Sequence, residues 1–455
     1  MTMADVRHQM PATAGRVAVR RGEASSKASS DETSAPRQVR GDAGRDLLAQ
    51  ALAKENMQAA WKRVKANRGA AGVDGRNIAE TKRYLVTAWP NIRNQLMEGT
   101  YRPSPVRRVA IPKPGGGERE LGIPTVTDRL IQQALLQVLQ PLIDPTFSEH
   151  SHGFRPGRQA RDAILAAQQH VQDGYRVVVD VDLTKFFDRV NHDILIDRLR
   201  KRVNDTGIVR LVRAYLNAGI MDDGVVVGRT EGTPQGGPLS PLLANVLLDE
   251  VDQQLERQGH RFVRYADDCN VYVRSMRAGE RVMELLKRLY AKLHLEINES
   301  KSAVASALGR KFLGYELWLQ NKCKAMHAVS KKSLKTFRER IRQITRRSGG
   351  CSIREVIDKL RQYVPGWKAY FRLAQTPKVW RRLDEWMRHR IRAIHLKQWK
   401  RTSTIYRELV KLGANPNVAR AVAAHKGRWW HGSGNAMNCA LPIAYFDRLC
   451  MPRLT

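Results

Sequence analysis

The stretch FVRYADDCNVYV, residues 262–273, decides the fold because it joins two strand-like runs through a pair of adjacent acids. The run at 262–263 precedes the pair and the run at 271–273 follows it, and both consist of the β-branched and aromatic residues typical of strands. The spacing predicts a β-hairpin with Asp267 and Asp268 at its tip. Most acid pairs of this kind are ordinary polar turns. Two like charges held side by side nevertheless repel each other unless a cation compensates them, which indicates a metal site as the alternative.

A second pair of acids favours the metal site. Asp180 and Asp182 follow the valine run 177–179 two positions apart, so their side chains share one face of the expected strand. Carboxylates from two neighbouring strands supply the hard oxygen ligands that Mg²⁺ takes, and protein-bound Mg²⁺ usually shares its coordination with substrate phosphates. Two such ions can activate an attacking hydroxyl and stabilise a leaving phosphate oxygen. The spacing by itself leaves Asp180 and Asp182 as equal candidates.

Strand-like runs alternate with longer helical stretches between residues 100 and 320. Helical patterns cover 129–142 and 239–255, and the whole region predicts an α+β fold with a mostly antiparallel sheet. An earlier helical pattern runs from residue 47 to 64. Residues 1–45 are rich in Ser, Ala, Arg and Gly without apolar periodicity, which predicts a disordered basic extension.

The charge balance points to a polyanionic partner. The chain has 79 Lys and Arg against 44 Asp and Glu, a formal net charge of +35. A solvated surface needs no such excess, whereas a protein that neutralises nucleic-acid phosphates does. An anionic membrane is the other possible partner, but the sequence has no run of about 18 apolar residues. Nucleic acid is therefore the expected partner.

The five cysteines argue against a structural zinc site, because no two of them have the two-residue spacing of zinc ligands. Reduced thiols and the lack of an export signal predict a cytoplasmic protein. The cysteines are Cys269, Cys323, Cys351, Cys439 and Cys450.

Residues 331–400 are strongly basic, with 21 Lys and Arg against 5 Asp and Glu. Large aromatic residues are spread through this stretch, and a helical bundle with an aromatic core accounts for most of them. They include Trp367, Tyr370, Phe371, Trp380, Trp386 and Trp399. Its basic face remains unexplained unless it contacts phosphates.

Ordered sequence blocks around the acids resemble those of the reverse transcriptase/maturases encoded by bacterial group II introns. The resemblance covers about residues 46–400 and includes the YADD box at 265–268. The remaining blocks, in chain order, are 111–119 (IPKPGGGER) with 121–124 (LGIP), 152–158 (HGFRPGR), 182–188 (DLTKFFD), 232–241 (GTPQGGPLSP), 295–298 (LEIN) with Lys301, and 312–315 (FLGY). Several blocks in the right order are a far stronger signal than any one of them.

The resemblance assigns the catalytic acids. Asp182 matches the first of them because Phe187 lies five positions beyond it, and Asp267 and Asp268 match the other two, so that the three together hold two Mg²⁺ ions. Asp180 is then a supporting or structural residue. Phe187 matches the side chain that excludes a ribose 2′-hydroxyl, which implies deoxynucleotide substrates; the alternative is an ordinary core phenylalanine.

The same resemblance assigns the contacts to the incoming nucleotide and to the primer. Lys113 and Arg119 match the cations that grip the triphosphate. Gln235 matches the residue that contacts the nucleotide sugar. Lys301 and Tyr265 are possible supports of the primer or the active-site acids, although a solvated Lys301 is an almost equal alternative.

The resemblance also predicts the domains. Residues 46–320 would be the fingers and palm of a right-hand polymerase, 325–400 a helical thumb and maturase domain, and 401–455 a small, possibly DNA-binding appendage. The relatives' endonuclease module carries paired Cys and His ligands that are not found here, which implies the endonuclease-lacking type. The expected RNA-binding residues of the thumb are Arg338, Arg342, Arg346, Arg347, Lys368, Arg381, Arg382 and Arg388.

The implied function is RNA-directed DNA synthesis combined with binding of the encoding intron RNA, assistance of its splicing, and retrohoming. The implied partners are the intron RNA, an RNA template with a DNA primer, target DNA and deoxynucleotides, and the protein would associate with the nucleoid when it acts on DNA. Two alternatives remain. One is a splicing cofactor that only binds RNA, and the other is an intron-independent reverse transcriptase associated with defence or CRISPR repeat acquisition.

Overall fold

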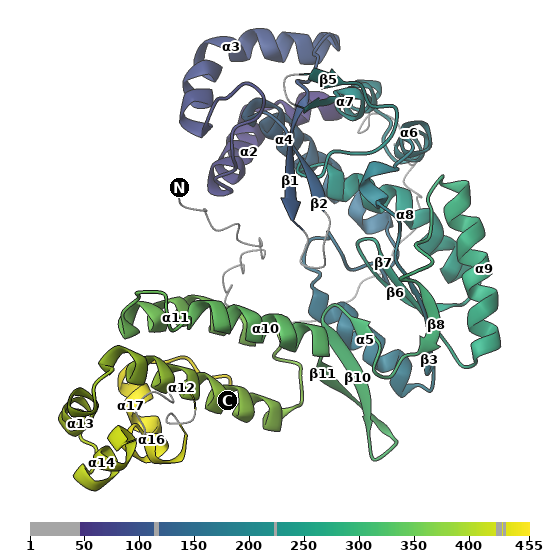
Figure 1. Cartoon of the computed structure of the whole chain (residues 1–455). Coiled ribbons are helices and arrows are strands. Elements are labelled where there is room, and N and C mark those ends of the chain that lie inside the picture. Colours follow the sequence, from purple (N-terminus) through teal and green to yellow (C-terminus); the bar gives the residue numbers. More distant parts are fainter. Residues whose placement is uncertain (1–45, 113–117, 223–224, 425–429, 431–433) are drawn as a thin grey trace, which may run out of the picture. The chain divides into compact units, whose positions relative to one another are not determined.

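The acid-tipped hairpin lies in a four-stranded antiparallel sheet (Figure 1). Its order is β6-β7-β3-β8, and the strands are β3 (Val177–Val181), β6 (Arg261–Tyr265), β7 (Asp268–Val273) and β8 (Ala303–Ser306). Tyr265 pairs with Asp268, so Ala266 and Asp267 form a two-residue turn. The strands predicted at 177–179, 262–263 and 271–273 are confirmed.

The computed structural model describes residues 46–112, 118–222, 225–424, 430 and 434–455. These residues fall within a single structural unit, residues 43–455. The extension predicted to be disordered, residues 1–45, lies outside the described residues. No helix in the described ranges is both long enough and apolar enough to cross a membrane.

Each face of the β6-β7-β3-β8 sheet packs against an apolar cluster, and alternate side chains of β7 point into one cluster or the other. Cys269 and Val271 join the larger cluster, with helices behind the sheet, while Tyr272 joins a smaller cluster on the opposite face. The helices of the larger cluster include α4 (Val126–Ile143), α6 (His192–Arg200), α7 (Thr206–Asn217), α8 (Ser240–Arg257) and α9 (Met276–Lys292). The opposite face is covered by α5 (Ala160–Gln172). The helices predicted at 129–142 and 239–255 are therefore confirmed as α4 and α8.

A second sheet, of order β2-β1-β4-β5, lies among the N-terminal helices. Its pairs are antiparallel except for β1 with β4. The elements of this region are α1 (Leu47–Ala51), α2 (Lys54–Ala66), α3 (Ile78–Glu98), β1 (Val106–Pro112), β2 (Glu118–Ile123), β4 (Ile220–Asp222) and β5 (Val225–Val227). Two short 3₁₀ helices, at Asp144–Thr146 and Phe186–Asp188, lie between β2 and β4 in the chain.

The single helix expected from residue 47 to 64 is interrupted after Ala51. The side-chain amide of Asn56 donates hydrogen bonds to the carbonyl oxygens of Ala51, at 2.7 Å, and of Ala134 in α4, at 3.1 Å. A polar side chain thus satisfies the end of α1 and ties the break to a neighbouring helix. The periodicity was right about helix content and wrong about continuity.

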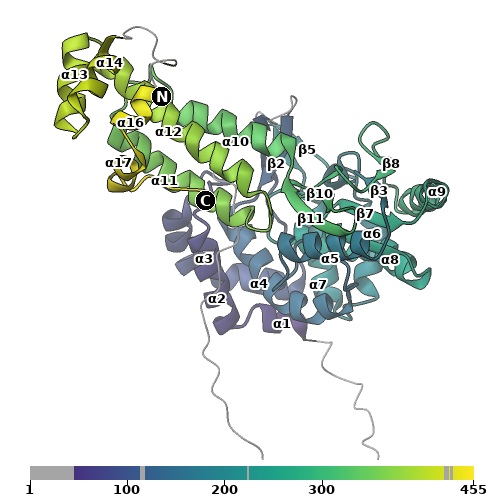
Figure 2. The ribbon, with the colours of Figure 1, turned by 90° about the horizontal axis from the view of Figure 1, so that it is seen from below.

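The C-terminal part is helical and follows a small sheet of order β11-β10-β9. Its three long helices lie beside one another (Figure 2). The elements are β9 (Lys311–Phe312), β10 (Tyr315–Gln320), β11 (Lys324–Val329), α10 (Lys331–Ile344), α11 (Ile353–Tyr370), α12 (Pro377–Trp399), α13 (Thr402–Lys411), α14 (Pro416–Ala424), α16 (Asn435–Ala440) and α17 (Ile443–Arg448).

One apolar cluster runs through these helices from Phe337 to Leu454, so contacts cross the domain boundary expected at residue 400. The Arg392 guanidinium donates to the Leu441 carbonyl oxygen at 2.7 Å. The Asp384 carboxylate accepts a hydrogen bond from the Leu454 amide at 2.8 Å. The domain boundaries themselves stay predictions.

Candidate active site

Asp182 is the residue that directly follows β3, and its backbone is held from one side. Its amide donates to the Ser302 hydroxyl at 3.0 Å, and its carbonyl oxygen accepts from the Asn298 amide at 2.8 Å. Val181 pairs with Cys269, so the same register places Asp182 next to the start of β7, where Asp268 lies. The structure therefore brings together the acids that the sequence places about 85 positions apart.

The turn that carries Asp267 is backed by the segment 150–153. Backbone bonds of 2.9 Å run from the His152 amide to the Arg264 carbonyl oxygen and from the Arg264 amide to the His150 carbonyl oxygen. Ala266 has a φ of 58°, a left-handed conformation that is uncommon for alanine. A Cβ atom on Gly153 would lie 2.1 Å from the Ala266 nitrogen, so only glycine allows this close approach.

A buried charge network fixes the same turn from inside the fold. Arg264 and Asp252 are both fully buried, and two guanidinium nitrogens donate to the Asp252 carboxylate at 2.6 and 2.9 Å. The remaining guanidinium nitrogen donates to the Ala266 carbonyl oxygen at 2.8 Å and to Asn245 Oδ1 at 2.9 Å. The Asn245 amide in turn donates to the Gly153 carbonyl oxygen at 2.9 Å. The acidic turn therefore rests on a satisfied polar network rather than on apolar packing.

Sequence reasoning missed this network, although it left a signal. Asn245 and Asp252 stand seven positions apart on α8, which places them, with the buried Asp249, on one face of a helix whose other buried residues are mostly apolar. Arg264 similarly interrupts a strand whose neighbours Phe262 and Val263 are fully buried. Polar residues on two apolar faces indicate a mutual partner.

Repulsion among the acids is visible in the electrostatics of Asp268. Partial burial of its carboxyl group, together with the nearby charges of Asp267 and Asp182, raises the pKa of Asp268 to about 7. Lys301 Nζ lies 2.9 Å from Asp182 Oδ2 as an ion pair. That oxygen is buried, and the ion pair with Lys301 is its contact among the described residues, since it accepts no other hydrogen bond from them. Asp182 thus has an ion-pair partner, while Asp268 is held beside further acids that disfavour its charged form.

This donor set has the chemistry that a divalent cation requires, because it consists of carboxylate oxygens, one of which has only Lys301 as a partner among the described residues. The described residues do not, however, hold three or more His, Cys, Asp or Glu side chains in an arrangement that could bind a metal ion. The Lys301 ammonium lies against Asp182. The chemistry of the acids fits a metal, and their side chains are not gathered around one point.

Asp180 has partners of its own within the fold. Arg310 Nε donates to Asp180 Oδ2 at 2.8 Å. The Asn270 amide, in the orientation that satisfies both groups, donates to Asp180 Oδ1 at 2.9 Å. Both carboxylate oxygens are therefore occupied, which favours the structural role expected for Asp180 over a ligand role.

The residues expected to contact a nucleotide are described only in part. Lys113 lies outside the described residues, and the side chain of Arg119 in β2 is likewise not described. The loop that contains Gln235 docks on β2, because the Gly122 amide donates to the Gln235 carbonyl oxygen at 3.0 Å. Gly236, with a φ of 144°, allows this contact, since a Cβ atom there would lie 2.5 Å from the Gly122 oxygen.

Phe187 and Tyr265 both lie between the acids in the chain, five positions after Asp182 and two positions before Asp267. The Phe187 side chain is 9% exposed, and its ring packs edge-on against Phe186 and Phe154, with centroid distances of 5.0 and 6.4 Å. Tyr265 is half-buried, and burial raises the pKa of its hydroxyl group. Phe187 is thus both a core contact and a neighbour of Asp182, so its role as a gate stays a prediction.

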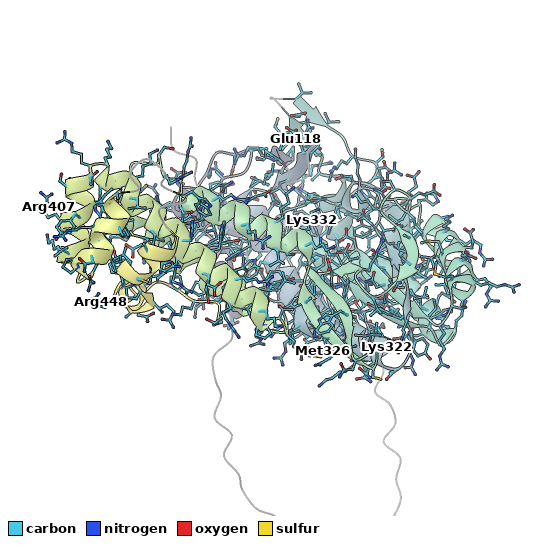
Figure 3. All side chains as sticks on the ribbon, turned by 60° about the horizontal axis from the view of Figure 1, so that its bottom comes forward. Glu118, Lys322, Met326, Lys332, Arg407 and Arg448 are labelled. Atoms are coloured by element: carbon cyan, nitrogen blue, oxygen red, sulfur yellow. The ribbon has the colours of Figure 1, made fainter. Side chains whose placement is uncertain are left out.

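The eight cations expected to bind RNA lie on α10, α11 and α12 or just beyond α10, and seven of them are exposed while Arg388 is half-buried. Within the described part of the chain, none of the eight forms an ion pair with a carboxylate. Lys368 Nζ lies 3.1 Å from the Thr455 carbonyl oxygen. Figure 3 shows two more cations of this region, Arg407 and Arg448, extending outward from their helices. The eight cations expected to bind RNA are therefore presented without acidic partners among the described residues, whereas Arg407 pairs with Glu408.

Comparison with known families defines the class first. Residues 111–317 match the family described as "Reverse transcriptase (RNA-dependent DNA polymerase)". The α+β part with its acid-tipped hairpin is therefore a reverse transcriptase domain of palm and fingers. Residues 334–413 match "Group II intron, maturase-specific domain". The chain thus matches a reverse transcriptase domain followed by a group II intron maturase-specific domain, and α11, α12 and α13 lie within the second match.

Two curated relatives illustrate the family. Protein YkfC of Escherichia coli (strain K12) is 38% identical over 191 residues, which cover 41% of this chain and 50% of the relative. The group II intron-encoded protein LtrA of Lactococcus lactis subsp. cremoris is 30% identical over 293 residues, covering 50% of this chain and 49% of the relative. The chain thus spans about half the length of the curated relatives it matches. A chain of the solved "Partial Cas6-RT-Cas1--Cas2 complex" is 25% identical over 55% of this chain and 43% of its own, with a TM-score of 0.36, too loose a likeness to carry an argument.

Proposed function

We propose that this protein is an RNA-directed DNA polymerase that uses two Mg²⁺ ions and is also a maturase. As a maturase it binds the group II intron RNA that encodes it, assists splicing and supports retrohoming, acting in the cytoplasm and at the nucleoid. The observation that carries the proposal is the meeting of Asp182 with Asp268 at the ends of β3 and β7, in a chain that matches the reverse transcriptase and maturase families.

Asp182, Asp267 and Asp268 are the residues that would hold the ions. When bound, the ions supply activation of the primer 3′-hydroxyl and stabilisation of the leaving pyrophosphate. The chain's own contribution is to hold the acids in place, with Asp182 fixed by Asn298 and Ser302. A pKa of about 7 leaves Asp268 partly protonated at neutral pH, and a nearby cation would favour its ionised form.

Lys301 is the proposed support of the acids. Its ammonium compensates Asp182 at 2.9 Å. A long, flexible lysine side chain can leave that position when a stronger cation arrives. Lys113, Arg119, Gln235 and Phe187 remain the proposed contacts to a deoxynucleotide, and Tyr265 remains a proposed neighbour of the primer.

The experiment that tests the polymerase is the double substitution Asp267→Ala with Asp268→Ala. DNA synthesis from a DNA primer on an RNA template should fall by at least about 10³-fold, because the charge that binds the ions is removed. Binding of the same RNA should remain, since the thumb cations are untouched. The matched control is Asp173→Ala, an exposed acid between α5 and β3, which should extend primers normally. Extension by the double variant would show the site assignment to be wrong.

The maturase activity needs its own readout. The intron RNA that flanks the reading frame should splice faster with the protein present, and the Asp267→Ala/Asp268→Ala variant should assist it as well as the unchanged protein does. A protein that extends primers but never accelerates splicing would be an intron-independent reverse transcriptase. A protein that assists splicing but never extends primers would be a splicing cofactor only.

Sugar selection tests the proposed gate. Phe187→Ala should admit ribonucleotides, because the ring that would contact a 2′-hydroxyl is removed. Phe186→Ala is the matched control, since Phe186 is also buried and its ring packs against the Phe187 ring. The two variants should lose similar stability, and only the first should change the ratio of ribonucleotide to deoxynucleotide incorporation. Equal ratios would mean that Phe187 is only a core residue.

A further inference from the structure

An arginine-lined cavity of about 480 Å³ lies where β6 begins and β7 ends. Its wall includes Arg261, Arg274, Arg281 and Arg288, together with His260 and Tyr175. None of the lining residues is an acid. Burial lowers the pKa of His260 below its usual value, so this imidazole is neutral at pH 7. The cavity therefore offers guanidinium donors without any negative charge of its own.

The cavity is separate from the proposed active site. Arg261 pairs with Tyr272, at the end of the hairpin opposite the turn that carries Asp267. Four residues of strand separate Arg261 from Tyr265, which corresponds to about 13 Å at the usual rise of a strand. The remaining wall comes from α9, which packs against β3, β7 and β8. A ligand in the cavity would therefore not meet the catalytic acids.

The four arginines have no acidic partner. All four residues are exposed, and none forms an ion pair with a carboxylate of any residue that the structure describes. Arg274 instead lies over the ring of Tyr175, with 4.9 Å between its guanidinium carbon and the ring centre. This contact holds one guanidinium flat at the wall and leaves its hydrogen-bond donors available.

A basic helix face in a chain of net charge +35 is most simply a solvated surface, but α9 distributes its acids unevenly. Lys287, which does not line the cavity, pairs with Glu284 at 3.0 Å and lies 3.8 Å from Glu299. Among the cations of α9, Lys287 forms these ion pairs, whereas Arg281 and Arg288 at the cavity form none with the described residues, and neither do Arg277 and Lys292 outside it. Unpaired guanidiniums gathered around one cavity indicate an anionic ligand.

The spacing of the arginines favours an extended ligand over a single phosphate group. Arg274, Arg281 and Arg288 stand seven positions apart, so the last two lie on one face of α9 about 10 Å apart along its axis. One small anion does not reach both, whereas successive phosphates of a polynucleotide do. Tyr175 adds an aromatic ring at the wall on which a base can stack.

We propose that this cavity binds the phosphodiester backbone of RNA, as a contact on the palm that is independent of both the active site and the thumb. The choice of RNA as the polynucleotide rests on the proposed function. The contact gives the protein a second hold on an RNA while the active site is occupied by primer and template.

The test removes two cavity cations and compares them with two others on the same helix. Arg281→Gln with Arg288→Gln changes the cavity, whereas Arg277→Gln with Lys292→Gln removes the same charge from exposed positions outside it. The probe is a labelled single-stranded RNA of mixed sequence, whose dissociation constant is measured over a range of NaCl concentrations. Each lost phosphate contact on single-stranded RNA lowers the slope of log K against log salt by about 0.7. The cavity pair should therefore lose about 1.4 in slope, and the control pair should lose clearly less.

Control measurements and a variant that keeps the charge accompany this comparison. Primer extension on a short template and the thermal midpoint should match the unchanged protein in both pairs, because neither touches the acids or the core. Arg281→Lys with Arg288→Lys keeps the charge and should restore most of the slope, which covers the case in which the glutamine pair folds poorly. Equal slopes for the cavity and control pairs would overturn the proposal.

Inorganic phosphate distinguishes the other source of the same chemistry. If the cavity pair loses affinity for inorganic phosphate while its RNA slope is unchanged, the site serves free phosphate and the RNA assignment is wrong. A failure of primer extension in the unchanged protein would contradict the proposed polymerase instead, and it would leave the comparison of slopes intact.

Discussion

Two buried arginines, one in the palm and one in the maturase domain, have partners of opposite kinds: one has a carboxylate, and the other has a neutral carbonyl oxygen and a ring. Arg264 is fully buried and shares its guanidinium with the equally buried Asp252 carboxylate. Arg392 is 4% exposed, yet its guanidinium donates to the Leu441 carbonyl oxygen at 2.7 and 3.1 Å and lies 4.9 Å from the Phe446 ring centre. No carboxylate among the described residues pairs with it.

The electrostatic consequences differ in sign. Although burial opposes it, Asp252 raises the pKa of Arg264 above the ordinary value for arginine. Burial, followed by repulsion from Arg388, lowers the pKa of Arg392 to about 10. Both guanidinium groups remain charged at neutral pH. The charge of Arg264 is compensated by a buried carboxylate, and among the described residues the charge of Arg392 is not. The maturase domain keeps positive charge even in its interior, and this charge adds to the field that attracts phosphates.

The largest expected effect comes from breaking the palm pair. Arg264→Met leaves Asp252 buried without a partner, so the free energy of unfolding should fall by about 3–5 kcal/mol in urea titrations. Primer extension should fall as well, because the Ala266 carbonyl oxygen loses its donor beside the acidic turn.

Arg264→Met combined with Asp252→Leu sharpens this prediction. It removes both charges and should recover most of the stability but not the primer extension, since the turn still lacks its support. If the single and double variants were equally unstable, the unpaired acid would not be the cause.

The next effect is a pH dependence of the maturase domain through His395. This residue is buried, shares a hydrogen bond of 2.8 Å between its Nε2 atom and the Tyr445 hydroxyl, and has its pKa lowered to about 4 by burial. An unfolded histidine has a pKa of about 6.5, so as the pH falls below that value the unfolded chain binds the proton first. Stability should therefore be complete above pH 6.5 and decline towards pH 4, by up to about 3 kcal/mol.

His395→Gln isolates this contribution, because glutamine keeps an acceptor for Tyr445 but does not titrate. The stability difference between the unchanged protein and the variant should shrink or reverse between pH 7 and pH 4.5. Because both proteins contain the same other histidines, the contributions of those histidines cancel in this stability difference. A difference that is constant over this range would contradict the assignment.

A smaller effect concerns the buried acid of the same domain. Asp384 is 2% exposed and accepts hydrogen bonds from the Leu454 and Thr455 amides, at 2.8 and 3.0 Å, rather than from a guanidinium. Asp384→Ala leaves both amides without this partner and should lower the free energy of unfolding by about 2 kcal/mol. Thr455→Val, which removes only one side-chain contact to Asp384, is the milder control. Equal losses in the two variants would mean that the amide bonds contribute nothing.

The smallest effect should come from the arginine that has no acid. Arg392→Met removes a buried charge together with its hydrogen bonds to one carbonyl oxygen, so the two contributions oppose each other. Stability in urea should change by less than about 1 kcal/mol, in contrast to the same substitution at Arg264. A loss as large as that of Arg264→Met would remove the distinction between the two regions.

Much of the candidate site could be predicted from local sequence. The hairpin around Asp267 and Asp268 formed where alternating strand residues indicated it, because its pairing is between neighbours in the chain. The structural role expected of Asp180 is likewise supported by Arg310 and Asn270. What sequence reasoning missed involves long separations or single polar side chains. Arg264 finds its partners on α8, and the break after Ala51 depends on one amide of Asn56.

By itself the sequence determined the strand-like runs, the order of the sequence blocks around the acids and the basic excess of residues 331–400. Each of these depends on local pattern or on composition. Only the tertiary structure decided which charges are cancelled. Asp252 meets Arg264, whereas no acid of the described residues pairs with Arg392. Four arginines, from β6, from the position after β7 and from α9, converge on one cavity. Charge cancellation is decided in three dimensions, because the Coulomb energy depends on distance and burial and not on separation along the chain.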